Sequence, residues 1–536
     1  MSARGAVVTA GLLTALAFTG AFGLGRFYDD WALAAAVQDA FTSGTTWAFI
    51  LGPFDQHWSP GWWAFEAANE ALVGWRSDIL IRGAIAALVG AQALVAWAAG
   101  RRLGFGWAAS AVAMGVVVLH PVNAAAFYSF DTYAQVAVNL IAWTALSRLA
   151  LGLLAGAPGL RARLAWTLAA LAGGLLLKEQ ALTIAAGLGA VAAWFTLAAP
   201  ASRADRRALW AAVAGAALIG AAFTLLRARM GLWMDPQGPY AVCLACVPGN
   251  LGLLTGGSLL PMQTLDVYLA LRDPGTRLVP LAAGALAASG VVAMLVIGLI
   301  GSWRRDRPGA PRAGLLVLLL ASATFPVAIL AHVGELYANA LVFWIAMLAG
   351  LSVEGWRARL SAGRPRTARL AAAWVVLLLV SLAASQRLNL GEMRRTGDRA
   401  AAWLARFDVA FAGLPPGSGV LIRGLDDLKG VDDYSLYRLT TPSLLLRGPV
   451  ALEVAGRRDL VILGDLEADT LAYWRRRAGA GRALFVADLG PGGVRLRPVP
   501  VEAAREGPGR AAGHSTTRLS SCPARAGVLA RRRRIG

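Results

Sequence analysis

Residues 164–199 read LAWTLAALAGGLLLKEQALTIAAGLGAVAAWFTLAA, a long apolar stretch that is interrupted only by the Lys-Glu-Gln triplet at 178–180. An α-helix rises about 1.5 Å per residue, so roughly twenty apolar residues cross the hydrocarbon core of a bilayer. The stretch therefore predicts two membrane spans, 163–178 and 181–199, with the polar triplet at the turn between them.

The whole chain has the composition of a membrane protein. It is 536 residues long, 57% hydrophobic and only 15% charged, whereas a soluble protein carries about 25% charged residues. We expect the first apolar run to be retained, because it lacks the basic segment and cleavage site of a signal peptide. The predicted fold class is an all-α polytopic bundle with about eleven transmembrane helices, at 5–25, 78–99, 104–120, 134–156, 163–178, 181–199, 208–227, 278–301, 313–333, 336–353 and 370–386.

The net charge of +20, from 51 Lys+Arg against 31 Asp+Glu, follows this topology. In a soluble chain it would suggest a nucleic-acid partner; here we expect none, because the basic residues gather in short runs that each follow an even-numbered span. Cytoplasmic loops carry such runs, so the N-terminus is expected in the cytoplasm. The basic residues are nearly all Arg, as in high-GC bacteria, so we expect a bacterial inner membrane. The runs are 101–102, 161–163, 203–207, 304–312 and 357–369.

The chain after the last span has a different pattern. We divide the protein into a transmembrane domain at 1–386, a small extracytoplasmic α/β domain at 387–500 and a basic tail at 501–536. The tail is rich in Arg, Gly, Ala and Ser and is expected to be disordered. The α/β domain is predicted from an amphipathic helix at 388–412, a second helix at 467–477 and short β-like runs at 420–423, 460–464 and 483–489.

An Asp pair lies just beyond the first span, in the sequence RFYDDW. Carboxylates at a membrane edge are costly and usually functional, although a solvated loop would also accept them. Adjacent side chains do not share a helix face. We therefore expect one of Asp29 and Asp30 to act as a base and the other to orient a group or bind a cation. Tyr28 and Trp31, which flank the pair at interfacial depth, favour a functional interpretation.

The segment FDQHWSPGWW, residues 54–63, places four aromatic rings beside two ionisable side chains on the outer side of the membrane. An aromatic belt at the membrane interface accounts for the Trp residues but not for Asp55 or His57. Rings beside hydrogen-bonding groups also suit a sugar, whose C–H faces pack on aromatic faces. We therefore predict that Asp55, His57 and Trp58 bind substrate.

The triplet at 178–180 places a cation on the side that the basic runs avoid. A simple turn between spans would also explain it, but short turns more often use Gly, Ser or Asn. A compact ammonium group suits the phosphate of a lipid. We therefore predict that Lys178 binds such a phosphate, together with its neighbour Glu179. Two other turns on this side are also polar: HPVNAAAFYSFDTYAQ, which contains His120 and Asp131, and HVGELYAN, which contains Glu335 and Tyr337.

The chain has three cysteines, of which Cys243 and Cys246 are three residues apart and Cys522 lies in the tail. The sequence contains no second CxxC and no nearby His pair, so a zinc site is not expected. Outside the cytoplasm, Cys243 and Cys246 can form a disulfide that fixes the outer loop at 228–277. Catalysis by this pair is not expected.

The order of these motifs resembles the GT-C superfamily of polyprenyl-phosphate-sugar-dependent membrane glycosyltransferases. The likeness is to the membrane part of the transmembrane and tetratricopeptide-repeat O-mannosyltransferases and their bacterial relatives. FYDDWALAAAVQD is similar to their diacid loop, HWSPGWWAFEAANEALVGWRSDILIR to their Arg/Tyr-Pro segment and second span, and HPVNAAAFYSFDTYAQ and KEQALTI to their His-Pro and Lys-Glu-Gln motifs. It covers about residues 1–355, in scattered short motifs. This chain departs from the pattern at Ser59, where Arg is expected before Pro60, in its closer Glu335–Tyr337 spacing and in lacking the tetratricopeptide repeats.

The resemblance implies that a sugar passes from a polyprenyl-phosphate carrier to an acceptor outside the cytoplasm, with inversion. A divalent metal ion is compatible with this activity but not required. The resemblance gives the motif residues three roles: base for Asp29 or Asp30, contact with the donor phosphate for Lys178, Glu179 and His120, and contact with substrate for Asp131, Glu335 and Tyr337.

Two other classes of function stay open. A transporter or flippase for an amphipathic substrate would place ionisable residues at mid-membrane depth and would show inverted repeats; neither is visible in the sequence. A membrane scaffold would have its ligand pocket in the C-terminal domain.

Overall fold

The structure is a computed structural model and describes residues 1–26, 29–54, 57–74, 79–129, 132–198, 202–232, 241–259, 289–303, 309–331, 335–360, 365–423, 459–463, 482–490 and 493–499. Two predicted site residues, Asp55 and Asp131, lie outside these ranges, as do the predicted helix at 467–477 and the tail at 501–536. Asp29 and Glu335 are described as the first residues of helices α2 and α16, without their side chains.

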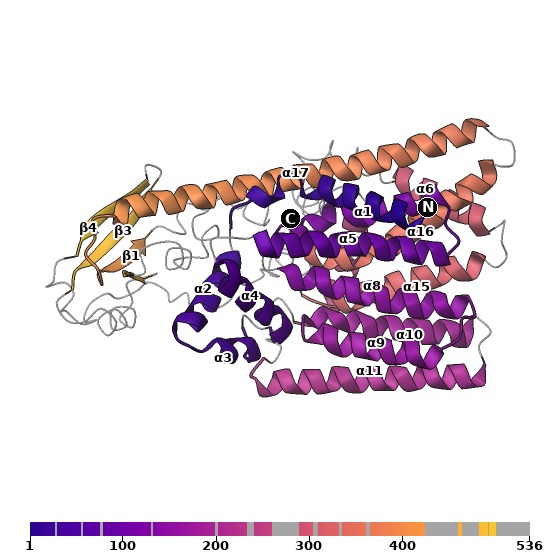
Figure 1. Ribbon diagram of the computed structural model, residues 1–536, viewed down its shortest axis with the longest axis horizontal. Helices are drawn as coiled ribbons and strands as arrows, with labels where there is room; N and C mark the ends of the chain where they lie inside the picture. Colours follow the sequence, from indigo (N-terminus) through magenta and orange to yellow (C-terminus); the bar gives the residue numbers. More distant parts are fainter. Residues whose placement is uncertain are drawn as a thin grey trace, which may run out of the picture.

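Long apolar helices make up most of the described chain (Figure 1). Within the ranges given above, seven helices are long and apolar enough to cross a bilayer, or eight if Trp107–Leu119 and Pro121–Tyr128, bent by 41°, form one broken span. The chain is a multi-pass membrane protein, and each predicted span overlaps a described helix. These are α1 (Ala3–Phe18), α5 (Ile79–Arg102), α6 (Trp107–Leu119), α8 (Tyr133–Leu154), α9 (Leu160–Leu175), α10 (Leu182–Leu197), α11 (Arg203–Arg229), Ser289–Trp303, α15 (Gly309–Ala328), α16 (Glu335–Leu360) and α17 (Pro365–Phe411).

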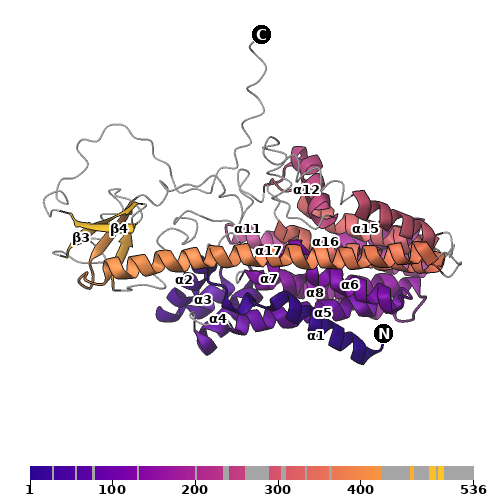
Figure 2. The same cartoon turned by 90° about the horizontal axis from the view of Figure 1, so that it is seen from above.

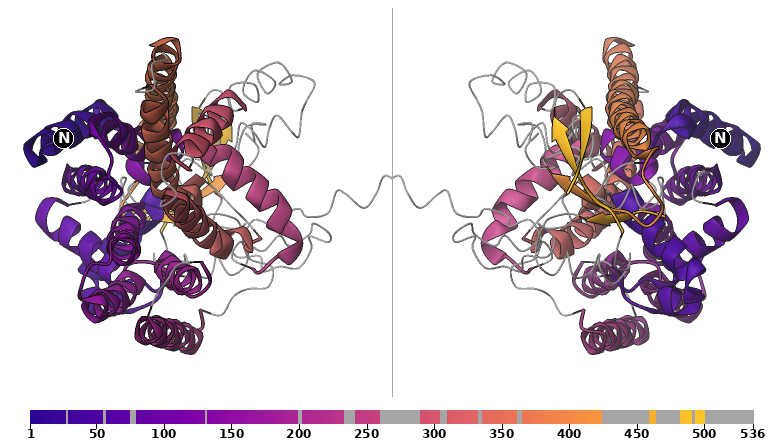
Figure 3. Two further views of the ribbon diagram at one scale, coloured as in Figure 1. Left: turned by 90° about the vertical axis from the view of Figure 1, so that its right-hand side faces the viewer. Right: turned by 90° about the vertical axis from the view of Figure 1, so that its left-hand side faces the viewer.

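Small residues let these helices approach closely. A Cβ at Gly115 of α6 would lie 2.7 Å from the side chain of Leu379 in α17, so any larger residue would have to displace that leucine. Such contacts hold helices together in lipid, where apolar burial alone gives little driving force. Helix α16 is the central element, because 94% of its apolar window is buried, whereas α17 buries only 17% of its own. Figure 3 views the helices end-on, with α17 at one edge.

Three short helices lie between the first two long ones, where the sequence predicted a loop and no helix. They are α2 (Asp29–Thr42), α3 (Thr46–Leu51) and α4 (Pro60–Val73). Helix α4 begins with Pro60, whose fixed φ suits the first turn of a helix. All three are shorter than a membrane span, which explains why a search for long apolar runs missed them. They gather at one end of the bundle (Figure 1).

Helix α17 is a single element of 47 residues. The predicted span at 370–386 and the predicted amphipathic helix at 388–412 are two parts of it. A helix of this length extends about 70 Å, more than twice the roughly 30 Å of a bilayer core. Its second half therefore leaves the bundle, and Figures 1 and 2 show it leading to the C-terminal sheet.

The C-terminal sheet has four strands in the order β2-β1-β3-β4. Strand β1 (Gly419–Arg423) is parallel to both β2 (Val461–Leu463) and β3 (Leu484–Gly490), and β4 (Gly493–Pro498) is antiparallel to β3. Buried Val420 and Ile422 of β1 join the same core as Phe407 and Phe411 of α17. The first three strands confirm the predicted sheet region, and the sequence missed β4.

The alternating direction of the helices gives the bundle two chemically different ends. We call one the motif end, because the turns at 120–129 and 178–182 lie there beside α2–α4, and the sheet lies beyond the same end (Figure 1). We call the other the arginine end, because the first or last turns of the helices there contain Arg102, Arg203, Arg312 and Arg357.

Candidate functional site

Glu179 is the centre of a small charged cluster at the motif end. Its Oε1 lies 3.1 Å from Nδ1 of His57 and 3.1 Å from Nη1 of Arg227. The three side chains come from the segment before α4, the turn after α9 and the last turn of α11. The sequence predicted His57 and Glu179 as site residues but missed Arg227, which lies at the end of an apolar run. The structure thus brings together two motifs that are 122 residues apart.

A close backbone contact fixes the cluster in place. The amide of Gly61 in α4 donates to the carbonyl of Leu176, at 2.8 Å, just before the Lys-Glu-Gln turn. A Cβ at Gly61 would lie 3.2 Å from that carbonyl oxygen and 2.9 Å from the side chain of Leu177. Glycine is therefore the residue that lets α4 dock here. This contact explains why the Pro-Gly pair follows Ser59 in the aromatic motif.

Lys178 is almost completely buried, with 8% of its surface exposed. Its Nζ lies 4.7 Å from the centre of the Trp62 ring, a distance at which a cation is attracted to the negative face of an aromatic ring. Trp62 stacks on Trp63 with ring centres 4.6 Å apart, and its Nε1 donates to Glu66 at 3.3 Å. The sequence predicted the cation and the Trp residues separately. The structure makes them one contact.

Trp58 has a different position from Trp62. Its Nε1 donates to the carbonyl of Leu51 at 3.0 Å, and its ring lies 5.8 Å from that of Phe223 in α11. It therefore packs between the short helices and α11. Its predicted role in substrate binding stays a prediction.

Asp30 of the Asp pair is buried, with 1% of its surface exposed, and its Oδ1 accepts a hydrogen bond from Ser129 at 3.1 Å. Tyr128 precedes Ser129 in the chain, and its carbonyl accepts a hydrogen bond from the buried guanidinium of Arg82 at 3.1 Å. The carbonyl of Leu24 accepts from the same guanidinium at 3.3 Å. A burial this deep is costly for a carboxylate without polar contacts, and the hydrogen bond from Ser129, which follows α7 (Ala124–Tyr128), offsets part of that cost.

Comparisons with known proteins agree with this architecture. No protein-family model matches the chain, and no curated protein sequence matches it. Among solved structures, ArnT from Cupriavidus metallidurans bound to undecaprenyl phosphate is similar, with a TM-score of 0.51 and 14% identity over 91% of this chain and 93% of that one. This chain has the GT-C fold.

Two further structures are also similar. ArnT in its apo state gives a TM-score of 0.52 at 14% identity, over 92% of this chain and 94% of that one. The Archaeoglobus fulgidus oligosaccharyltransferase in its apo form gives 0.46 at 13% identity, over 90% of this chain and 69% of that one. The fold explains the arrangement of the helices. It does not identify the reaction, which depends on the residues of the site.

His120 ends α6 in this fold and is held at both ring nitrogens. Its Nδ1 accepts from the amide of Val122 at 3.3 Å, so Nε2 carries the proton and donates to the carbonyl of Ser258 at 2.9 Å. Ser258 belongs to α12 (Val247–Leu259). The ring therefore fixes the His-Pro turn against α12. Its predicted contact with the donor phosphate stays a prediction.

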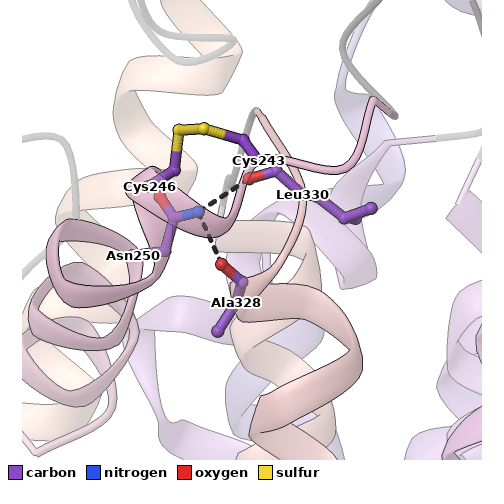
Figure 4. Close-up of a disulfide and its surroundings, with 5 residues drawn as sticks. All are labelled: Cys243, Cys246, Asn250, Ala328 and Leu330. Atoms are coloured by element: carbon purple, nitrogen blue, oxygen red, sulfur yellow. Dashed lines mark hydrogen bonds between the residues drawn. A yellow bond between two sulfur atoms is a disulfide. The ribbon is translucent and has the colours of Figure 1, made fainter. Parts of the chain in front are cut away.

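The CxxC lies at the start of the same α12 element and forms a disulfide between Cys243 and Cys246 (Figure 4). The amide of Cys243 donates to the carbonyl of Ile329 at 2.7 Å. The side chain of Asn250 donates to the carbonyls of Ala328 and Leu330, at 2.9 and 2.7 Å. The disulfide segment thus satisfies the carbonyl groups at the end of α15, which a helix end leaves without partners.

Four buried amide side chains form a continuous chain between three of the predicted motifs. Asn339 donates to Asn123 and accepts from Asn139, and Asn139 in turn accepts from Gln180. Asn123 belongs to the His-Pro turn, Gln180 to the Lys-Glu-Gln turn, and Asn339 follows Tyr337. The sequence analysis did not single out these residues as a group. Their signal was present, since polar side chains inside apolar helices usually have a specific partner.

The remaining predicted residues are placed less fully. Tyr337 is half-buried and packs on the main hydrophobic core. Tyr133, which follows the predicted Asp131, stacks on Phe65 of α4 with ring centres 3.9 Å apart. Among the residues that the structure describes, no three His, Cys, Asp or Glu side chains gather as a metal would need.

Proposed function

We propose that this protein is a glycosyltransferase that moves a sugar from a polyprenyl-phosphate carrier to an acceptor on the outer side of a bacterial inner membrane, with inversion. The observation that carries the proposal is the buried Lys178 beside the Glu179–His57–Arg227 cluster at the end of a GT-C bundle. Burying an ammonium group is costly, and a phosphate bound at this depth would offset its charge. ArnT, whose fold this chain shares, is solved bound to undecaprenyl phosphate.

The proposed reaction is a single displacement at the anomeric carbon. A carboxylate of the Asp pair removes the proton from an acceptor hydroxyl, and the hydroxyl oxygen forms the new bond to the anomeric carbon. The bond from that carbon to the phosphate oxygen breaks, and polyprenyl phosphate leaves with the electron pair. Asp30 suits the role of base, since burial and the contact with Ser129 hold it in one orientation.

The cations supply the electrostatic part of the reaction. Negative charge builds on the phosphate as the sugar leaves, and an ammonium group fixed beside it stabilises that charge. Trp62 holds Lys178 in place. Glu179 contacts both His57 and Arg227. Its negative charge offsets the positive charge of Arg227, which reduces the repulsion between Arg227 and Lys178 before the donor binds.

The experiment is a cleavage assay with purified protein and a panel of undecaprenyl-phosphate-linked radiolabelled hexoses, with a cell-envelope extract as acceptor. We expect release of undecaprenyl phosphate from at least one donor by the wild type, and loss of that release in Asp30→Asn. If the wild type moves intact donor between the leaflets of proteoliposomes and cleaves none, the protein is a flippase. If it neither cleaves nor moves any donor, the proposal is wrong.

A further inference from the structure

A small cavity lies at the arginine end, far along the helices from the Lys178 cluster. Its volume is about 50 Å³. It opens between the end of α5, the end of α8 and the start of α15, and it is lined by Arg102, Leu103, Leu151, Leu154, Ala155 and Arg312. Two cationic side chains thus share a cavity with three leucines, where α5 and α8 end.

Positive charge gathers around this cavity. Arg148 and Arg163 lie close enough to Arg102 to repel it electrostatically. Arg312 donates to the carbonyl of Leu103 at 3.1 Å, and Arg163 donates to two carbonyl groups, so both are held by backbone contacts. For the residues with described coordinates, none of these four guanidinium groups has a carboxylate within 4.0 Å.

Other arginines of the protein do have a carboxylate partner. Arg357, at the same end, pairs with Glu354, and Arg227, at the motif end, pairs with Glu179. Arg102 and Arg312 share the cavity, and Arg148 and Arg163 add positive charge around Arg102, so the site gains free energy when an anion enters it. The topology of the chain explains why arginines occur at the arginine end. It does not explain why Arg102 and Arg312 line the same cavity.

We propose that this cavity binds the phosphate group of an anionic phospholipid from the leaflet at the arginine end. Planar guanidinium groups match a phosphodiester through paired hydrogen bonds. The three leucines provide apolar surface beside the phosphate for the glycerol and upper acyl chains. Basic pockets between helices at this level of a membrane bind anionic headgroups. The inference does not depend on the proposed glycosyl transfer.

The test is binding of cardiolipin to the full-length protein in detergent, followed by native mass spectrometry and thermal unfolding. Phosphatidylcholine and inorganic phosphate serve as the two comparison ligands. The test variant is Arg102→Gln with Arg312→Gln, which removes both lining charges and keeps side-chain hydrogen bonding. The matched control is Arg206→Gln, which removes one charge from an exposed position in the first turn of α11, away from the cavity.

We expect cardiolipin to bind the wild type and Arg206→Gln equally and to raise their unfolding temperatures. The double variant should bind cardiolipin at least tenfold more weakly while unfolding at the wild-type temperature in phosphatidylcholine. Equal binding of phosphatidylcholine, or equal loss in Arg206→Gln, would overturn the proposal because the attraction would then be unspecific. Full stabilisation by inorganic phosphate alone would overturn the lipid assignment and show a free-phosphate site.

Discussion

The two ends of the helix bundle carry positive charge in opposite ways. At the motif end, Lys178 is buried against Trp62, and Arg227 pairs with Glu179. At the arginine end, Arg102 and Arg312 line an open cavity without a described carboxylate partner. A charge that serves topology needs only water or headgroups around it. A charge that serves chemistry must be held in one position, and its neighbours show how it is held.

The comparison depends first on which end of the bundle faces the cytoplasm. Reporter fusions after residues 102, 207 and 369 should all report the cytoplasm, because each lies in or beside a basic run. A fusion near 430 should report the outer side. The effect is all-or-none. A cytoplasmic signal at 430 would put the sheet and Lys178 on the cytoplasmic side and remove the basis for an outer acceptor.

The largest expected effect on turnover is at the Asp pair. A general base contributes about 10²–10⁴-fold to a rate, so Asp30→Asn should lower cleavage of the lipid-linked sugar by that factor. Asp29→Asn should cost less, because we expect only one of the two carboxylates to take the proton. Ser129→Ala serves as the control, since it removes one hydrogen bond to Asp30 and keeps the carboxylate. Wild-type turnover in both Asn variants would exclude the pair as base.

A moderate effect is expected at Asn339, the middle of the buried amide chain. Asn339→Leu leaves the amides of Asn123 and Asn139 without their partner, and each unsatisfied buried group costs about 1–3 kcal/mol. The unfolding temperature should therefore fall by several degrees, and donor affinity should weaken because Asn139, which accepts from Gln180 of the Lys-Glu-Gln turn, loses its own partner. Ser352→Ala, on the same helix but nearer the arginine end, is the control. Identical unfolding curves for both variants would mean that the chain contributes nothing specific.

The smallest effect is expected at the disulfide. A double Cys243→Ser and Cys246→Ser variant should keep wild-type turnover, because the bond holds backbone at the end of α15 and offers no chemistry of its own. Closing so short a loop removes little chain entropy, so we expect a stability loss of about 2 kcal/mol or less. Complete loss of turnover with unchanged expression would show that the disulfide segment takes part in the site.

Run length was sufficient to predict the long helices, because a bilayer demands a fixed number of apolar residues whatever the tertiary contacts. It could not find α2–α4, which are too short to span a membrane and depend on packing against the bundle end. It also divided α17 in two, because the helix continues as a polar surface helix after its apolar half. Strand β4, with its Pro and Arg residues, carried no clear β pattern.

The candidate site was predicted as separate motifs, and the structure supplies the contacts between them. His57 and Glu179 could be named from local residue types, but their pairing across 122 residues could not. Arg227 was missed although it gave a signal. It lies at the outer end of the predicted span 208–227, on the side that the basic runs avoid. Asn123, Gln180 and Asn339 each stand within a recognised motif, and only their three-dimensional proximity reveals one amide chain.

The measurement that tests the central claim most directly is a titration of undecaprenyl phosphate into purified wild type, Lys178→Ala, Lys178→Arg and the control Arg206→Gln. A charge-assisted contact is worth roughly 1.5–3 kcal/mol, so Lys178→Ala should bind at least tenfold more weakly. Lys178→Arg should recover part of the affinity, because the charge is kept and its shape is not. Arg206→Gln should match the wild type. Unchanged affinity in Lys178→Ala would contradict the account, because the buried cation at the motif end would then have no phosphate to bind.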